Sequence, residues 1–141
     1  MRRGVTLIEL VLVMTVAGIL AGIAYPRVGQ LLDGIAVERA ARAIALAHRH
    51  ARAVAIVRGR RTQLSIAADT IRLRPVGDTS DSWAHPGPVA SGVLLAGPPR
   101  VVTFSPVGLA TGVSNATYVL TRGASRRTVV VSRLGRVRVT P

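Results

Sequence analysis

The stretch that decides the fold is residues 3–26, which read RGVTLIELVLVMTVAGILAGIAYP. Every residue from Val5 to Tyr25 is apolar or small except Glu9. An α-helix rises about 1.5 Å per residue, so this run forms a helix about 31 Å long, which matches the hydrocarbon core of a bilayer. The sequence therefore predicts a transmembrane helix over residues 5–25.

Glu9 argues against two simpler interpretations of this segment, a cleaved secretory signal and a plain membrane anchor. A carboxylate within a hydrophobic segment costs about 2.5–3.5 kcal/mol, and residues 10–25 contain no cation that would offset it. If the chain is cut after Gly4, the new α-amine of Val5 lies four residues before Glu9, which is one helical turn. That amine could pair with Glu9 of its own chain or of a neighbouring subunit. Glu9 is therefore a candidate assembly residue.

The run Arg3-Gly4-Val5-Thr6-Leu7-Ile8-Glu9-Leu10 closely resembles the class III signal of type IV pilins and type II secretion pseudopilins. The resemblance implies that a prepilin peptidase cuts between Gly4 and Val5, removes a leader of residues 1–4, and methylates the α-amine of Val5. It further implies a single-pass protein of the inner membrane, in contact with its lipid, whose C-terminal domain lies in the periplasm. The mature chain would then enter a filament with other pilins or pseudopilins. One departure is Val5, where the family usually has phenylalanine.

Beyond the membrane segment the apolar pattern becomes amphipathic. Apolar residues recur at three- and four-residue steps as far as Val57, which predicts that one helix begins near Thr6 and continues over residues 26–58. Pro26 and Gly34 are expected weak points of this helix, because proline and glycine are poor helix formers. Gly59 is expected to end it.

Residues 59–141 predict an antiparallel β-rich domain. Alternating segments at 63–66 and 71–74 predict a hairpin, and residues 75–92, rich in Gly, Pro, Ser and Asp, predict a loop. One long helix followed only by strands predicts an α+β fold of the type IV pilin kind, with the helix packed on antiparallel sheet. Further strands are expected at residues 93–96, 100–104, 117–122, 126–132 and 136–140.

A second resemblance lies in the C-terminal half. Residues 104–108, FSPVG, and residues 129–138, VVVSRLGRVR, resemble the corresponding elements of GspH/FimT-type minor pilins. Together with the N-terminal signal, the resemblance covers most of the chain. It implies a structural subunit of a type II secretion pseudopilus or of a type IV pilus.

The sequence gives no support for an enzyme, a cofactor, a metal site or a small-molecule substrate. There is no cysteine, so thiol catalysis and Cys-ligated metals are excluded. His48 and His50 are two residues apart on the predicted helix and point about 200° apart, so they cannot share a metal ion. His85 is expected to stand alone in a loop. The segment Asp78–Ser82 lacks the ligand pattern of a calcium loop.

The charge of the chain is strongly positive, at +13, and all nineteen cations are arginines. Codon bias in a GC-rich genome favours Arg over Lys, but it does not explain why acids are so few. Arg136 and Arg138 are expected on one face of a strand, where paired arginines can clamp phosphates. In some competence-associated relatives a C-terminal Gly-Arg-x-Arg element, here residues 135–138, binds DNA. Two alternatives stay open, a solvated strand face and a non-specific site for double-stranded DNA, to which Arg126, Arg127 and Arg133 would contribute.

Overall fold

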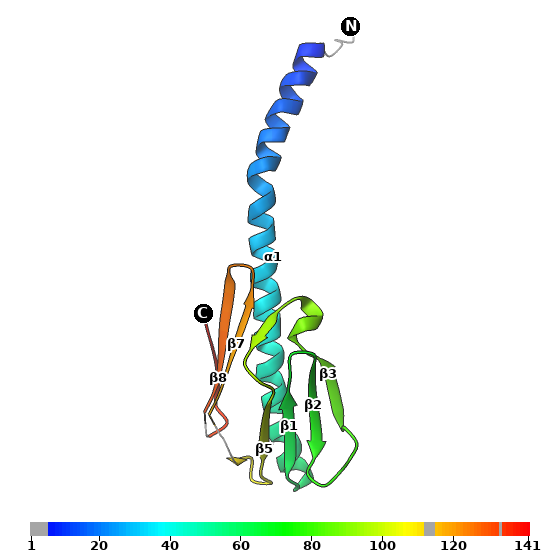
Figure 1. Cartoon of the computed structure of the whole chain (residues 1–141), viewed down its shortest axis with the longest axis vertical. Helices are drawn as coiled ribbons and strands as arrows, with labels where there is room; N and C mark the ends of the chain where they lie inside the picture. Colours follow the sequence, from blue (N-terminus) through cyan, green and yellow to red (C-terminus); the bar gives the residue numbers. More distant parts are fainter. Residues whose placement is uncertain (1–5, 112–114, 133) are drawn as a thin grey trace. The chain divides into compact units, whose positions relative to one another are not determined.

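The structure is a computed structural model that describes residues 6–111, 115–132 and 134–141. One long helix, α1, precedes nine strands and a short 3₁₀ helix, η1, in these ranges (Figure 1). Their bounds are α1 Leu7–Arg58, β1 Thr62–Ile66, β2 Thr70–Pro75, β3 Trp83–Pro86, η1 Pro88–Ser91, β4 Leu94–Ala96, β5 Arg100–Phe104, β6 Ala110–Thr111, β7 Ala116–Arg122, β8 Ser125–Val131 and β9 Val137–Thr140. The predicted α+β fold class is confirmed.

The chain divides into two compact units, residues 1–32 and Asp33–Pro141, so the second half of α1 belongs with the strands. The single predicted helix is confirmed, and it runs without interruption through the two expected weak points at Pro26 and Gly34. A proline within a helix costs about 3 kcal/mol, because it removes one backbone hydrogen bond and crowds the carbonyl four residues earlier. Gly59 ends the helix as predicted, with a left-handed φ of 59° that glycine adopts at low cost.

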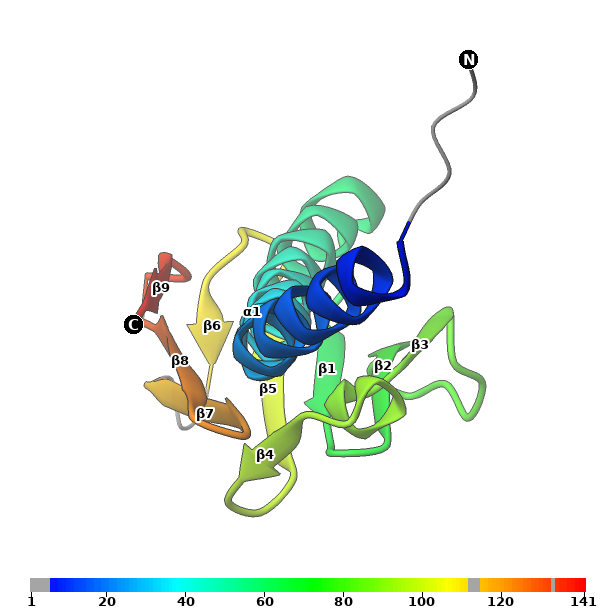
Figure 2. The same ribbon diagram turned by 90° about the horizontal axis from the view of Figure 1, so that it is seen from above.

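The strands of the second unit form two antiparallel sheets, with orders β3-β2-β1-β5-β6 and β4-β7-β8-β9. The predicted hairpin is confirmed as β1 and β2, with Leu64 opposite Leu73. The five further predicted strands are confirmed as β4, β5, β7, β8 and β9, each bound shifted by no more than one residue. Figure 2 shows the edge strands β9 and β3 on opposite sides of α1.

The sequence misassigned one segment and missed one strand. Residues 75–92 are not all loop, because they contain β3 and η1, and the two-residue strand β6 was not expected at all. Strand β3 has the sequence WAHP and is exposed over most of its length, so it lacks the apolar alternation that reveals a half-buried strand. It forms because Trp83 pairs with Leu73 of β2, a tertiary contact.

The core lies between the second half of α1 and the inner faces of both sheets. The helix contributes mostly alanines, whose small side chains let the sheets approach it closely. Large side chains from the sheets, Phe104 and Tyr118 above all, fill the space. The buried members are Val37, Ala40, Ala41, Ile44, Ala47, Ala51 and Ala55 of α1, with Leu64, Ile66, Ile71, Leu73, Val93, Val102, Phe104, Ala110, Ala116, Tyr118, Leu120, Val129 and Val131 of the β region.

The turn between β7 and β8 is fastened to α1. Arg122 Nε lies 2.8 Å from Asp33 Oδ1, and Nη1 of the same guanidinium donates to the carbonyl of Ser91. Gly123 has φ +54°, and a Cβ at this position would collide with the Asp33 carboxylate. Gly34 faces the same turn, because a Cβ there would lie 3.7 Å from Ser125 Oγ. Small residues on both sides therefore let the turn reach the helix.

Candidate functional site

The first turn of α1 is held by Thr6. The Thr6 hydroxyl accepts a hydrogen bond from the backbone N–H of Glu9 at 3.3 Å, and the Thr6 carbonyl accepts one from Leu10 N–H at 3.2 Å. This is the geometry of an N-cap, which satisfies donors that would otherwise have no partner. Glu9 thus stands exposed in the first turn, where the helix dipole favours a carboxylate. Gly4 and Val5, the predicted cleavage and methylation residues, lie outside the described residues.

Residues 7–25 of α1 are apolar or small except for Glu9, and they are uncovered. An 18-residue window has a mean hydropathy of 2.4, and none of it is buried within the chain. Such a surface suits lipid tails or the helices of other subunits, and it agrees with the predicted membrane anchor. Large exposed apolar side chains here are Leu7, Ile8, Leu10, Val11, Leu12, Val13, Met14, Val16, Ile19, Leu20 and Ile23.

The C-terminal arginines fall into two groups. Arg138 of β9 and Arg136, one residue before it, are both exposed, while Val137 and Val139 pack against the core. This is the alternation that the sequence predicts, although Arg136 itself precedes the strand. On the neighbouring strand, Arg126 is also exposed. The predicted contributor Arg133 lies outside the described residues.

Arg127, by contrast, is half-buried and pairs with Glu38 of α1. Its Nε lies 3.1 Å from Glu38 Oε2, and Nε of Arg42 lies 2.8 Å from Glu38 Oε1. Hydrogen bonds from Arg42 and then Arg127 lower the pKa of the Glu38 carboxyl. The structure therefore separates Arg127 from Arg126. Sequence reasoning did not foresee the partner, since Glu38 and Arg127 are 89 residues apart.

Arg52 of α1 was not among the predicted site residues, yet it lies close to them. A Cβ added at Gly135 would be 3.7 Å from Cδ of Arg52, so this side chain lies against the turn that precedes Arg136. Arg52 is exposed. It therefore adds to the positive charge around Arg136, a proximity that no local sequence signal reveals.

The histidines occupy two different environments. His48 is buried, with Nε2 3.2 Å from the Tyr118 hydroxyl and Nδ1 without a hydrogen-bond partner among the described residues. Burial lowers the pKa of His48 to about 4 and raises the pKa of Tyr118 to about 12. His50 is exposed, as expected from the 200° separation of the two rings on the helix.

His85 does not stand alone in a loop, as the sequence suggested, because it lies on β3 with its ring stacked on Trp83 at 5.7 Å. In the Asp78–Ser82 segment, Asp78 pairs with Arg60, and Asp81 pairs with Arg72 and Arg74. Among the residues that the structure describes, no three His, Cys, Asp or Glu side chains gather as metal ligands.

Comparisons with known proteins agree with this arrangement. Residues 1–25 match the model of the prokaryotic N-terminal methylation motif, and residues 40–135 match the model of the type II transport protein GspH. The chain is 31% identical to the pilin-like protein PilA1 of Thermus thermophilus, over an alignment that covers 98% of each chain.

Among solved structures, the chain is similar to the type IV minor pilin FimU of Pseudomonas aeruginosa PAO1. The TM-score is 0.61 at 17% identity, and the alignment covers 74% of this chain and 88% of that one. A second crystal form of FimU gives a TM-score of 0.58. The fold is therefore that of a minor pilin. Because the GspH model spans more than half of the chain and the methylation motif spans the segment around Glu9, this protein belongs to the GspH family of type IV pilin-like minor pilins.

Proposed function

We propose that this chain is a structural minor subunit of a type II secretion pseudopilus or a type IV pilus. The observation that carries the proposal is Glu9, exposed in the capped first turn of a helix whose N-terminal apolar segment is uncovered. A lone carboxylate at that depth is costly in lipid and is relieved when a cation meets it. The α-amine of Val5 in a neighbouring subunit supplies that cation once the leader is removed.

The chain then has four parts with separate roles. Residues 1–4 are the leader, residues 5–25 anchor the protein in the inner membrane and pack against other subunits, residues 26–58 continue the helix, and residues 59–141 form the β domain in the periplasm. The partners are the prepilin peptidase, membrane lipid and other pilins. The function needs no catalytic residue, cofactor or small-molecule substrate.

Processing tests this proposal directly. Because Gly4 precedes Val5 and Glu9, the mature protein is expected to begin at Val5 and to carry a methylated α-amine. The measurement is intact-mass analysis of the full chain extracted from membranes of its native host. A chain that still begins at Met1, or one cut beyond Ala24, would contradict the proposal.

A second candidate function is non-specific binding of double-stranded DNA. It is favoured by Arg136 and Arg138, which are exposed and have no ion-pair partner among the described residues. Arg52 and Arg126 add cations nearby. Phosphate contacts of this kind give affinity without sequence preference and make the affinity fall with salt.

Replacing both Arg136 and Arg138 by Gln is expected to weaken DNA binding and to reduce the slope of log affinity against log salt by about two, because each phosphate contact contributes about 0.9. Fluorescence anisotropy with duplex DNA over a salt titration measures both quantities. The matched control is the double replacement of Arg39 and Arg49, two exposed arginines of α1 that line cavities beside β3 and η1, whereas β9 belongs to the other sheet. Equal losses in both variants, or no binding by the wild type near physiological salt, would rule out the DNA-binding candidate.

A further inference from the structure

The net charge of the second unit, Asp33–Pro141, restricts which neighbouring subunits it can bind. Residues 33–141 contain sixteen arginines and five acids, a formal charge of +11 with histidine neutral. Four of the acids, Asp33, Glu38, Asp78 and Asp81, are already paired with arginines of the same unit. The outward-facing charge is therefore positive. A second copy of this chain would be repelled, whereas an acidic partner would be attracted.

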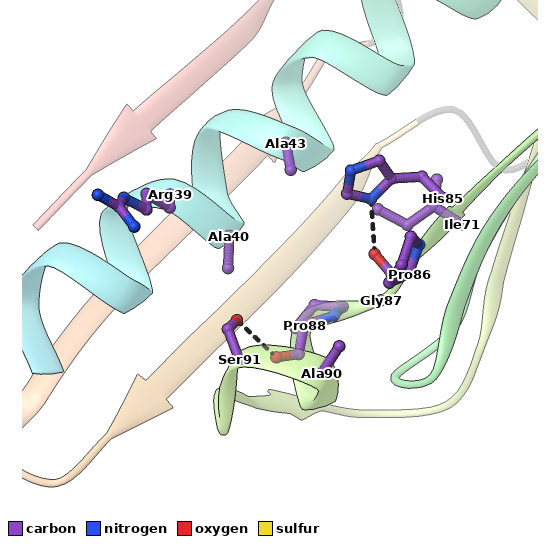
Figure 3. Close-up of a pocket in the computed structure, with 10 residues that line it drawn as sticks. All are labelled: Arg39, Ala40, Ala43, Ile71, His85, Pro86, Gly87, Pro88, Ala90 and Ser91. Atoms are coloured by element: carbon purple, nitrogen blue, oxygen red, sulfur yellow. Dashed lines mark hydrogen bonds between the residues drawn. The ribbon is translucent and has the colours of Figure 1, made fainter.

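An apolar groove runs along α1 on the side of β3 and η1. It consists of two adjoining cavities of about 220 and 460 Å³, which share Ala43 and His85. Figure 3 shows the first cavity, with Ala40 and Ala43 of α1 facing the chain from His85 to Ser91. We call the whole the β3 groove. Its other main lining residues are Arg39, Leu46, Arg49, His50, Trp83 and Pro86.

The wall of the β3 groove is aromatic and its floor is aliphatic. Trp83, the only tryptophan of the chain, meets the ring of His50 edge-on at 5.4 Å and stacks on His85 at 5.7 Å. Leu46 of α1 lines the same cavity as these rings and is 61% exposed. Alanines on the same helix face leave room above the backbone. The groove therefore offers a place for an apolar side chain of a partner.

Cations stand at both ends of the β3 groove. Arg39 lines the first cavity and Arg49 the second, no acid lines either one, and both arginines are exposed. Neither takes part in an ion pair with any residue that the structure describes. They are ten positions apart on the helix, which corresponds to about 15 Å along the axis. The groove is thus apolar in the middle and positive at its ends.

We propose that the β3 groove binds an acidic subunit next to this chain in the filament, an inference that rests on the proposed function. The segment that fits has two carboxylates about 15 Å apart with an apolar side chain between them. The carboxylates meet Arg39 and Arg49, and the apolar side chain lies between Leu46 and Trp83. Charge complementarity gives the pairing its selectivity over a second copy of this basic chain.

Site-specific photocross-linking of the full chain in its native host tests this. The photoreactive residue p-benzoylphenylalanine replaces Leu46 in the groove or, as a control of matched type and exposure, Leu94 on β4, which is 67% exposed. From position 46 we expect a cross-link to a subunit that carries a prepilin signal and an acidic periplasmic domain, identified by mass spectrometry. From position 94 we expect at least tenfold less of that product.

Charge reversal provides the second arm. Replacing Arg39 and Arg49 by Glu is expected to reduce the cross-link from position 46 at least tenfold, whereas replacing Arg58 and Arg61 by Glu, two exposed arginines that do not line the groove, with the same change in net charge, is expected to preserve it. A cross-link to a second copy of this chain, to a basic subunit or to nothing, from a protein that is processed and present in the filament fraction, overturns the inference. An equal loss of the cross-link in both charge-reversal variants also overturns the inference. A chain that is uncut and absent from filaments instead contradicts the proposed function.

Discussion

Replacing Glu9 by Ala is expected to lower incorporation of the chain into filaments by about two orders of magnitude, while cleavage and membrane insertion continue. An unpaired carboxylate in the hydrocarbon costs about 2.5–3.5 kcal/mol, and assembly relieves that cost when a neighbouring α-amine pairs with it. Alanine has no such cost to relieve, so that part of the driving force for assembly disappears. At about 1.4 kcal/mol per tenfold change in an equilibrium constant, this loss of driving force corresponds to incorporation that is about a hundredfold lower.

Co-purification with the other pilins, normalised to the amount of processed chain in the membrane, measures this effect. The control is Thr15→Ala, which alters a polar residue of the same segment whose hydroxyl donates to the Val11 carbonyl of its own helix. That variant should assemble as the wild type does. If the Glu9 variant also co-purifies normally, the charge-pairing argument is wrong.

Lowering the pH from 7 to 4.5 is expected to reduce the free energy of unfolding of the β domain by about 2–3 kcal/mol through His48 alone. Burial lowers the pKa of this ring from 6.5 to about 4 in the folded state. Between these values the unfolded chain binds a proton that the folded chain does not. Stability is therefore full above pH 6.5 and declines as the pH falls. Denaturant unfolding of a fragment that begins at Val28, followed at several pH values, measures the slope.

Two variants isolate the contribution of His48. The double variant His48→Phe/Tyr118→Phe removes the titrating ring together with its hydrogen-bond partner and should lose most of the pH dependence. The single variant Tyr118→Phe keeps the ring and should retain that dependence. Staying above pH 4.5 keeps Glu38 charged, because its ion pairs with Arg42 and Arg127 lower its pKa. A wild-type slope equal to that of the double variant would show that His48 does not titrate in this range.

Local patterns were enough to predict the helix, the β1–β2 hairpin and most of the other strands. The apolar period changes from 3.6 to two near Thr62, and that change marks the boundary between helix and sheet. Strand β3 has no such pattern, because only one of its edges pairs and most of its residues face solvent. Its existence depends on Leu73 and Trp83 meeting, which is decided by the whole fold.

Local patterns also predicted some of the candidate functional residues. The alternation of Arg136 and Arg138 with the partly buried Val137 and Val139 follows from the period of a strand, and Glu9 is recognisable because it interrupts an apolar run. The pair of Arg127 with Glu38 and the approach of Arg52 to Gly135 join α1 to strands far along the chain. A single sequence contains no signal for such pairs. The β3 groove was missed for the same reason, since one of its walls belongs to an unpredicted strand.

The way the helix is built into the domain has a mechanical consequence. Its buried residues extend from Val37 to Ala55, about 27 Å along the axis, and contact both sheets, while the Asp33–Arg122 pair fastens the end nearest the membrane segment. Tension along α1 therefore acts in shear on all of these contacts together, whereas peeling would break them one after another. Rupture then requires the whole interface to yield at once, so we expect the domain to resist a pull along the helix better than a pull across it.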